Sequence, residues 1–449
     1  MLYAGLFVLF SLVCIVLAFK RHPIYGLYFY LATTFVFPPG RWWGYIFEDL
    51  RWSLLSAVIT ILAILFHRGK LAEKPPFLQS GAPVILVLYA AVMWLQTPWA
   101  LDLDAHIRGA TIFTKSIVAY WVVYRVADSK EHMRDVMLAH VLGCAFLGIL
   151  AEATGRDVGA RLDGVGGPGL DDSNTLGMYF ATGAVVAAGL ALTQRGWRRY
   201  LSVICGALIL NGLVLANSRG AFLGLVAGMF VFFLCHARQH RKLLLAFGVV
   251  GMIGMVAITD SKFIERMYTI EDVTSEDDDA DTSARSRVAV AKAQLQMFAD
   301  YPLGTGHRGT EALSTKYIER RWLTLVADGE EAARSSHNTF LTALVEQGAE
   351  GAILYVALVI WIIRAGARMR RQNGANSDPV LTSLAAAITG ALAVVIVSGN
   401  TADFLLVEVQ FWMLALLASA LAFKGAADRA PAANQKKPAP IGRMTVKAN

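Results

Sequence analysis

Long apolar runs recur along the whole chain, and they constrain the fold more than any other feature. Their length of about 17–20 residues is what a helix needs to cross about 30 Å of hydrocarbon. Inside lipid every backbone polar group must be satisfied within the protein, so these runs must be helices. The thirteen runs are 2–19, 24–39, 53–67, 82–97, 110–126, 135–152, 175–193, 200–216, 220–236, 242–258, 350–366, 380–398 and 405–423. We predict an all-α polytopic membrane protein with about 12 (12–13) transmembrane helices and one long loop that contains helical segments.

The composition agrees with this fold class. Of 449 residues, 56% are apolar and 17% are charged, whereas about a quarter of the residues in soluble domains are charged. The first run lacks the charged start and small-residue cleavage site of a signal peptide, so we expect it to stay in the membrane. The cysteines all fall within apolar runs, and we expect small buried residues rather than disulfides. They are Cys14, Cys144, Cys205 and Cys235.

Basic residues concentrate in alternate loops. These loops are 67–74, 194–199, 236–242 and 364–371. The positive-inside rule places them in the cytoplasm. The net charge of +7 therefore reflects membrane topology, and we expect no nucleic-acid partner.

The alternation divides the chain into four parts. We predict N-terminal transmembrane helices over 1–258, a long outer loop over 259–336, C-terminal transmembrane helices over 337–424, and a disordered cytoplasmic tail over 425–449. The long loop contains more acidic than basic residues. Loops of this length are translocated largely regardless of charge, so the short loops decide the topology.

Two polar segments precede predicted helices on the outer side. In residues 161–174, glycines and a proline exclude regular structure. This segment is either a connector with a helix cap at Asp172 or a neighbour, or a loop whose Arg161 and Asn174 contact a ligand. In residues 216–224, Ser218 can cap a helix and Arg219 falls in its first turn.

Arg219 stands at an unusual place for a cation. The helix dipole disfavours a positive charge at a helix start, but the free N–H groups there attract anions. An arginine beside that helix start is explained if an anion lies between them. The alternative is an interfacial arginine that extends to lipid headgroups.

A third arginine-bearing segment covers residues 283–309. An amphipathic stripe there predicts a helix on the membrane surface. The stripe comprises Arg287, Val288, Ala291, Leu295 and Phe298. In the alternative interpretation, Arg285 and Arg287 turn inward.

The fourth polar segment introduces the span that follows the long loop. On one continuous helix, His337, Leu341, Leu344 and Gly348 share a face. Glu346 lies on the opposite face, so we do not expect it to orient the histidine. His337 is either a cap or interfacial residue, or a group that moves a proton near neutral pH.

Motifs for metal ions are weak. The acidic run 276–281 contains Asp277-x-Asp279, a spacing that can hold a metal and a diphosphate. The run lies on the outer side, where nucleotide sugars are not expected, so we interpret it as a solvated loop. H-E-x-x-H and paired CxxC motifs are absent from the sequence, and we predict no metal and no cofactor.

Together, three arginines and a histidine gather at one predicted membrane face. Guanidinium groups bind phosphate in a bidentate manner and keep their charge. A lipid pyrophosphate in the outer leaflet is an anion of the kind that they would bind.

The polar segments resemble motifs of the bacterial O-antigen ligase and polymerase superfamily. SHNTFLTALVEQG is similar to its H-N-x-x-L…E-x-G signature, and SRGAFLG to its S-R-G block. GLDDSNTLG resembles a D-P-N block, with Ser173 in place of proline. RSRVAVAKAQLQMFADYPLGTG resembles an R…W…P-L-x-G-x-G block, with Ala291 in place of tryptophan. The resemblance covers roughly residues 160–425 and depends on the blocks in combination.

The resemblance implies glycan transfer at the periplasmic face of the bacterial inner (cytoplasmic) membrane, by a multi-pass protein that uses neither metal nor nucleotide. The donor would be a glycan on undecaprenyl pyrophosphate, and membrane lipids would surround the protein. It implies that His337 is the catalytic histidine and that Arg219 and Arg287 bind the pyrophosphate. The remaining candidate substrate-binding residues are Arg285, Arg161, Asn174, Asp172 and Asn338.

The acceptor stays open within the family. Lipid A–core oligosaccharide, which we favour, makes the protein an O-antigen ligase; a second lipid-linked glycan makes it a polymerase; a protein hydroxyl makes it a protein O-glycan ligase. A secondary transporter or lipid flippase is the alternative from another class. Such a protein is expected to place ionisable residues in the middle of the membrane, where this sequence has few, such as Lys115 and His140.

Overall fold

The computed structural model describes residues 2–155, 162, 164–236, 282–325, 331–371 and 378–429. Several predictions fall outside these residues: the span 242–258, Arg161, the acidic pair Asp277 and Asp279, and most of the C-terminal tail.

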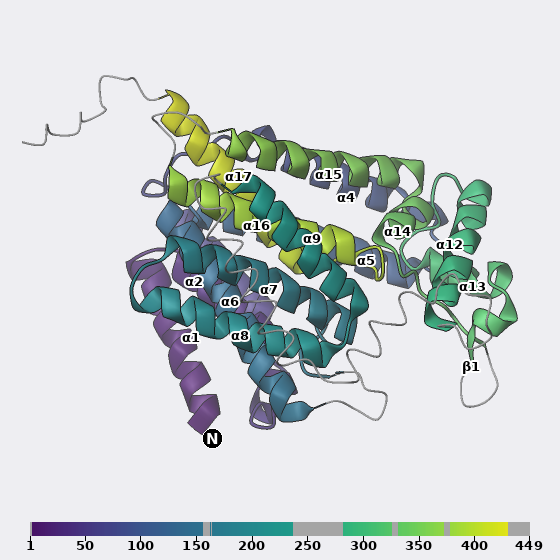
Figure 1. The fold of residues 1–449 in the computed structure, drawn as a ribbon, viewed down its shortest axis with the longest axis horizontal. Helices are drawn as coiled ribbons and strands as arrows, with labels where there is room; N and C mark the ends of the chain where they lie inside the picture. Colours follow the sequence, from purple (N-terminus) through teal and green to yellow (C-terminus); the bar gives the residue numbers. More distant parts are fainter. Residues whose placement is uncertain are drawn as a thin grey trace, which may run out of the picture.

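The described residues form fifteen α-helices and one small antiparallel sheet (Figure 1). The first nine helices are α1 (Leu2–Lys20), α2 (Ile24–Val36), α3 (Trp52–Phe66), α4 (Ala82–Leu95), α5 (Leu103–Val126), α6 (Lys130–Thr154), α7 (Ser173–Thr193), α8 (Trp197–Ala216) and α9 (Arg219–Cys235). The later helices are α12 (Thr282–Asp300), α13 (Gly309–Tyr317), α14 (Thr339–Glu346), α15 (Gly348–Arg370), α16 (Pro379–Ser398) and α17 (Glu408–Arg429). Short 3-10 turns cover Pro38–Gly40, Tyr45–Phe47, Phe77–Gln79, Thr97–Trp99 and Arg320–Trp322.

The sheet consists of two strands of two residues each. Strand β1 (Thr324–Leu325) pairs with β2 (Glu331–Ala332), with Thr324 opposite Ala332. It lies beside α12 and α13 at one end of the helix bundle (Figure 1).

Eight of the described helices are long and apolar enough to cross a membrane, and α3 and α9 are shorter apolar helices. The protein is therefore a multi-pass membrane protein, as the apolar runs predicted. Helices also occupy the predicted spans 24–39 and 110–126, as α2 and α5. The total of about 12 spans stays a prediction.

Small residues set the closest helix contacts. Gly220, Gly224 and Gly228 lie four residues apart on one side of α9 and face α16. A methyl group at Gly228 would lie 2.8 Å from the carbonyl oxygen of Gly390, so only glycine permits this approach. In lipid, where apolar burial does not drive helix association, such close backbone packing holds helices together.

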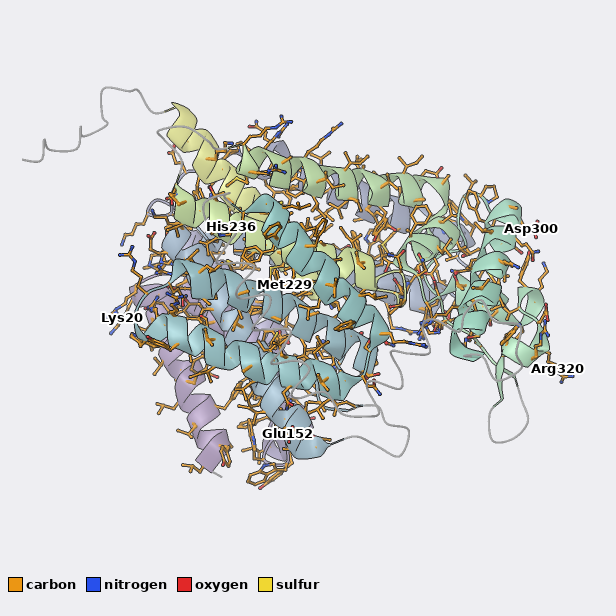
Figure 2. The ribbon with its side chains drawn as sticks, in the orientation of Figure 1. Lys20, Glu152, Met229, His236, Asp300 and Arg320 are labelled. Atoms are coloured by element: carbon orange, nitrogen blue, oxygen red, sulfur yellow. The ribbon has the colours of Figure 1, made fainter. Side chains whose placement is uncertain are left out.

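The basic loops that the structure describes lie at one end of the bundle, which we call the basic end. Lys74, from the α3–α4 loop, donates to the carbonyls of Tyr124 and Ala127 near the end of α5, and to Ser419 of α17 at 3.0 Å. Figure 2 shows Lys20 and His236 toward this end, and Asp300 and Arg320 toward the other. This grouping agrees with the predicted alternation of loops. Which end faces the cytoplasm stays a prediction.

Asp128 joins three loops at the basic end. Its carboxylate accepts hydrogen bonds from His132 Nδ1 at 2.6 Å, from His22 Nε2 at 3.4 Å and from the backbone N–H of Ala72 at 3.3 Å. Burial alone would raise the pKa of Asp128, but these donors hold its pKa well below the usual value.

We expect Asp128→Asn to destabilise the protein by about 1–3 kcal/mol, because one partner of a largely buried hydrogen-bond network is removed. A carboxylate with a lowered folded-state pKa contributes stability that is complete above the unfolded pKa of about 3.9 and is lost as the pH falls through the folded value. The difference in melting temperature between Asp128→Asn and wild type, measured in detergent, should therefore persist from pH 8 to pH 5.

Asp135→Asn is the matched control. Asp135 forms a more exposed ion pair with Arg198 at 3.2 Å, and such pairs contribute about 0–1 kcal/mol. Equal melting temperatures for Asp128→Asn and wild type would contradict the role of Asp128 as the link between the loops.

Candidate functional site

The start of α7 packs against the start of α9. Asp172 caps α7 by accepting hydrogen bonds from the backbone N–H groups of Asn174 at 2.9 Å and Thr175 at 3.1 Å. The side chain of Asn174 in turn accepts a hydrogen bond from Ser218 Oγ at 3.0 Å. Two segments that are more than forty residues apart in the sequence thus form one wall of a site.

Arg219 begins α9 immediately after this contact. Asn217 ends α8 in the left-handed conformation, with φ 49°, and reverses the chain. Ser218 then caps α9 by accepting from the N–H of Ala221 at 3.4 Å. Arg219 is only 8% exposed. Because a guanidinium keeps its charge, burial at this position requires polar or anionic partners.

The end of α16 connects Arg219's helix to the segment of His337. Ser398 Oγ donates to the carbonyl of Gly220 at 3.1 Å. The next residue, Gly399, accepts a hydrogen bond from the N–H of Thr339 at 2.7 Å. The loop that follows α16 binds the same threonine, because the N–H of Phe404 donates to Thr339 Oγ1 at 2.9 Å. The starts of α9 and α14 are therefore held to the same helix end.

His337 lies just before α14 and not on it. Asn338 caps this helix, accepting from the N–H of Leu341 at 3.0 Å. A break at Gln347 then separates α14 from α15. The prediction that residues 337–348 present one continuous helical face is therefore wrong. The half-buried histidine is placed by the cap and by Thr339, two residues further on.

Helix α12 is connected to the same segment. Gln294, which is 1% exposed, donates through Nε2 to Ser336 Oγ at 2.9 Å. The N–H of Asn338 donates to the same hydroxyl at 3.2 Å. Arg287 lies seven residues before Gln294, two helical turns away on the same side of α12. Gln294 thus joins the helix of Arg287 to the segment of His337.

The stripe predicted for α12 is not the face that packs against the rest of the protein. The apolar side chains buried on this helix are Val290, Ala293 and Met297, whereas Val288 and Leu295 are 49% and 55% exposed. That the exposed stripe lies on the membrane surface stays a prediction. Apolar residues occur on two sides of α12, and the side that packs against α13 and α14 is the one that is buried. The backbone of Arg285 lies in this helix.

A further arginine, absent from the prediction, lies close to these residues. Arg334 Nη2 donates to Ser286 Oγ at 3.0 Å, next to Arg287 in the sequence. The N–H of Arg334 donates to Ser314 Oγ, also at 3.0 Å. Its position three residues before His337 is the only signal that the sequence provides.

The glycine-rich blocks of the sequence pack against each other. Gly304 and Gly348 have φ of +86° and +71°, a region that favours glycine. A side chain on Gly304 would meet the backbone of Gly348 at 2.7 Å. The N–H of Gly306 donates to the carbonyl of Glu346 at 2.9 Å. The blocks PLGTG and EQG therefore form one tight contact that joins the start of α13 to the end of α14.

A buried acid–base group lies behind α14. His307 Nδ1 is 3.0 Å from Glu346 Oε2, and this carboxylate is 5% exposed. Burial alone would lower the pKa of His307, but Glu346 raises the pKa above its usual value. Burial, together with the charge of Glu346, raises the pKa of Asp403 to about 7. Glu346 therefore orients His307 and not His337, in agreement with the prediction that it does not orient His337.

One cluster has the spacing of a metal site. The ligand atoms of His22, Asp128 and His132 lie within 4.8 Å of one another at the basic end. The N–H of Ile24 donates to His22 Nδ1 at 3.2 Å, so the proton of neutral His22 lies on Nε2 and points at Asp128. These donors fit a network of hydrogen bonds better than a metal ion, which would require the lone pair of Nε2.

Most of the candidate site residues meet at the end of the bundle opposite the basic end. Hydrogen bonds join the starts of α7 and α9, which carry Asn174 and Arg219. The end of α16 connects α9 to the segment of His337. Gln294 connects that segment to α12, the helix of Arg287. The prediction missed Arg334, His307 and the role of Thr339. Their partners are distant in sequence.

The comparison with protein families agrees with this arrangement. Residues 204–356 match the Wzy_C family model, which is described as O-antigen ligase. The matched segment begins in α8, ends in α15 and includes Arg219, Arg287 and His337. No curated protein matches the chain. The resemblance to the O-antigen ligase family that the sequence motifs indicated is therefore confirmed over residues 204–356.

Proposed function

We propose that the protein is an O-antigen ligase of lipopolysaccharide biosynthesis. It transfers a glycan from undecaprenyl pyrophosphate to a sugar hydroxyl of lipid A–core oligosaccharide. The observation that carries this proposal is the hydrogen-bonded connection between Arg219's helix, the end of α16 and the segment of His337. A buried cation and a histidine at one end of a membrane bundle suit a reaction in which a lipid-linked pyrophosphate is the leaving group.

The proposed reaction is a direct displacement. The acceptor oxygen forms a bond to the anomeric carbon as the bond from that carbon to the pyrophosphate oxygen breaks. The proton of the acceptor hydroxyl passes to His337, and the departing pyrophosphate takes the electron pair. Arg219 and Arg287 bind the negative charge that develops on it. Attack from the opposite side predicts inversion at the anomeric carbon.

Arg285, Arg161, Asn174 and Asp172 belong to the proposed donor site. Asp172 and Asn174 shape the wall beside Arg219 through the cap of α7 and the contact with Ser218. Asn338 sets the position of His337 by capping α14. We assign Arg334 to the same site, because its guanidinium lies beside Ser286 on α12.

An apolar cavity supports the choice of a lipid-linked donor. It has a volume of about 610 Å³ and lies between α2, α3 and α5. Its wall includes Phe37 and Pro38, and the ring of Phe37 would meet a side chain at Gly167. Gly167 belongs to the loop that leads to Asp172. We assign this cavity to part of the polyprenyl chain, whose pyrophosphate would then lie near Arg219.

The positive-inside rule supports the proposed orientation. The basic loops lie together at one end, so the candidate site faces the opposite, periplasmic side. The site requires neither nucleotide nor metal in this mechanism, because the donor is already activated by its pyrophosphate.

The first experiment uses the purified protein with lipid-linked glycan donor, lipid A–core acceptor and EDTA, and without nucleotide. We expect elongated lipid A–core. Arg219→Ala, Arg287→Ala and His337→Ala should each lower kcat by about 10²–10³, because each removes a group that acts on charge developing in the transition state. Gel mobility of the lipid A–core product measures the rate.

Arg321→Ala is the control for this series. Arg321 is 70% exposed, and its described partners are the exposed Glu319 and the neighbouring ring of Trp322, so its loss should leave kcat unchanged. Unchanged transfer by a stably inserted His337→Ala protein would overturn the proposal. Polymer formed from donor alone would make the protein a polymerase, transfer to a protein hydroxyl a protein O-glycan ligase, and donor translocation without transfer a flippase.

The cavity makes a separate prediction. Ala57→Trp places a large side chain in its wall, and we expect a raised KM for the lipid-linked donor with a smaller change in kcat, because binding of the chain is lost before the reacting groups are disturbed. Initial rates over a range of donor concentrations separate the two constants.

Leu62→Trp is its matched control. Leu62 lies on the same helix but is 50% exposed and outside the cavity wall, so its KM should remain that of the wild type. A normal KM for Ala57→Trp would show that the polyprenyl chain binds elsewhere.

A further inference from the structure

A second cavity lies at the basic end, between the start of α4 and the last turns of α15. Its volume is about 510 Å³, and we call it the α4–α15 pocket. These two helices lie side by side (Figure 1). The wall includes Gly81 from the loop before α4, and Ala357, Ile360, Trp361, Arg364 and Arg368 from α15. The pocket is far from the candidate glycan-transfer site, which lies at the other end of the bundle.

The wall changes from apolar to cationic along α15. Ala357, Ile360, Arg364 and Arg368 are three or four residues apart, so their side chains form one stripe. The apolar half lies toward the centre of the membrane, and the arginines lie in the last two turns of the helix. A phospholipid has the same order, with acyl chains in the hydrocarbon and a phosphate at the interface.

The charge in this pocket is of one sign. Among the residues that the structure describes, its wall contains two arginines and no carboxylate. Within the described part of α4 and α15, neither Arg364 nor Arg368 forms an ion pair. A third cation lies nearby, since Lys424 Nζ donates to the carbonyl of Arg368 at 2.6 Å. An anion that enters the pocket therefore meets positive charge with no competing carboxylate in the wall.

The loop before α4 packs closely against Trp361 of α15. Gly81 has a φ of +87°, a conformation that side chains disfavour. A methyl group on Gly81 would lie 2.6 Å from Trp361 Nε1. The indole N–H therefore lies against the loop, where Gln79 and Ser80 supply further hydrogen-bonding groups. Tryptophan at such a position is typical of the headgroup region of a membrane.

We propose that the α4–α15 pocket binds an anionic phospholipid, with its phosphate between Arg364 and Arg368 and its acyl chain along Ile360 and Ala357. Arginine suits a phosphate diester because its guanidinium donates two parallel hydrogen bonds. The lipid occupies the leaflet at the basic end, which is the cytoplasmic leaflet in the orientation proposed above. This site is independent of the glycan-transfer reaction.

The test is native mass spectrometry of the full-length protein in detergent, titrated with phosphatidylglycerol or with phosphatidylcholine of the same chains. We expect wild type to bind phosphatidylglycerol more tightly. Arg364→Gln/Arg368→Gln should weaken phosphatidylglycerol binding at least about tenfold and leave phosphatidylcholine binding unchanged. Each single substitution should weaken it about threefold, which gives a readout if the double variant does not fold.

Lys70→Gln/Arg195→Gln is the matched control. Both cations belong to loops at the basic end but lie outside the pocket, so this variant loses the same net charge and should bind phosphatidylglycerol as wild type does. Equal losses in the two double variants would show a general charge effect and overturn the site. Equal binding of both lipids by wild type would do the same.

Glycerol 3-phosphate distinguishes a lipid from a soluble phosphate. At millimolar concentration it should not displace phosphatidylglycerol, because it lacks the acyl chains that the apolar half of the pocket contacts. Full displacement would show that the pocket binds a phosphate group alone and would overturn the lipid proposal.

Discussion

The close approach of α9 to α16 is the constraint on which the rest of the site depends. Glycines at every fourth position of α9 allow backbone contact with α16, and a single methyl group at Gly228 would break it. This contact places the start of α9 beside the end of α16. The loop after α16 then binds Thr339. The positions of Arg219 and His337 therefore follow from packing in the middle of the bundle.

This arrangement explains how a buried arginine is tolerated near a membrane. Arg219 is the first residue of α9, where the N–H groups of a helix point outward and favour an anion. In the function that we propose, the guanidinium and these N–H groups both attract a phosphate, and the helix fixes the N–H groups before the ligand binds. Donors fixed in this way cost little reorganisation when charge develops on a leaving group. The free-energy cost of burying Arg219 is offset when the protein folds, so it does not add to the activation free energy of the reaction.

Local chemistry made the helix caps predictable, and distant packing made other features unpredictable. Asp172 and Ser218 act as caps, as the sequence indicated, because a cap depends on residues two or three positions away. The face of α12 could not be read in this way, since apolar residues occur on two of its sides and only α13 and α14 decide which is buried.

Contacts between residues that are distant in the sequence could not be predicted either. Glu346 and His307 are thirty-nine residues apart, and no periodicity connects them. Likewise, the prediction of one continuous helix across residues 337–348 did not take Gly348 into account. Its positive φ permits a break after α14. The family-like motifs contain the candidate residues Arg219 and His337, but only the tertiary contacts show which segments lie beside them.

The two arginine-rich regions differ in how they can attract an anion. Arg364 and Arg368 are exposed, so salt screens their charge over about 8 Å at physiological ionic strength, and lipids can exchange there. Arg219 is almost fully buried, where screening is weak and each interaction is stronger. An exposed pair suits a structural lipid that is abundant in the surrounding leaflet. In the function that we propose, a buried arginine suits a scarce donor that must be held while a bond breaks, because its charge would stabilise the departing pyrophosphate more effectively than an exposed charge could.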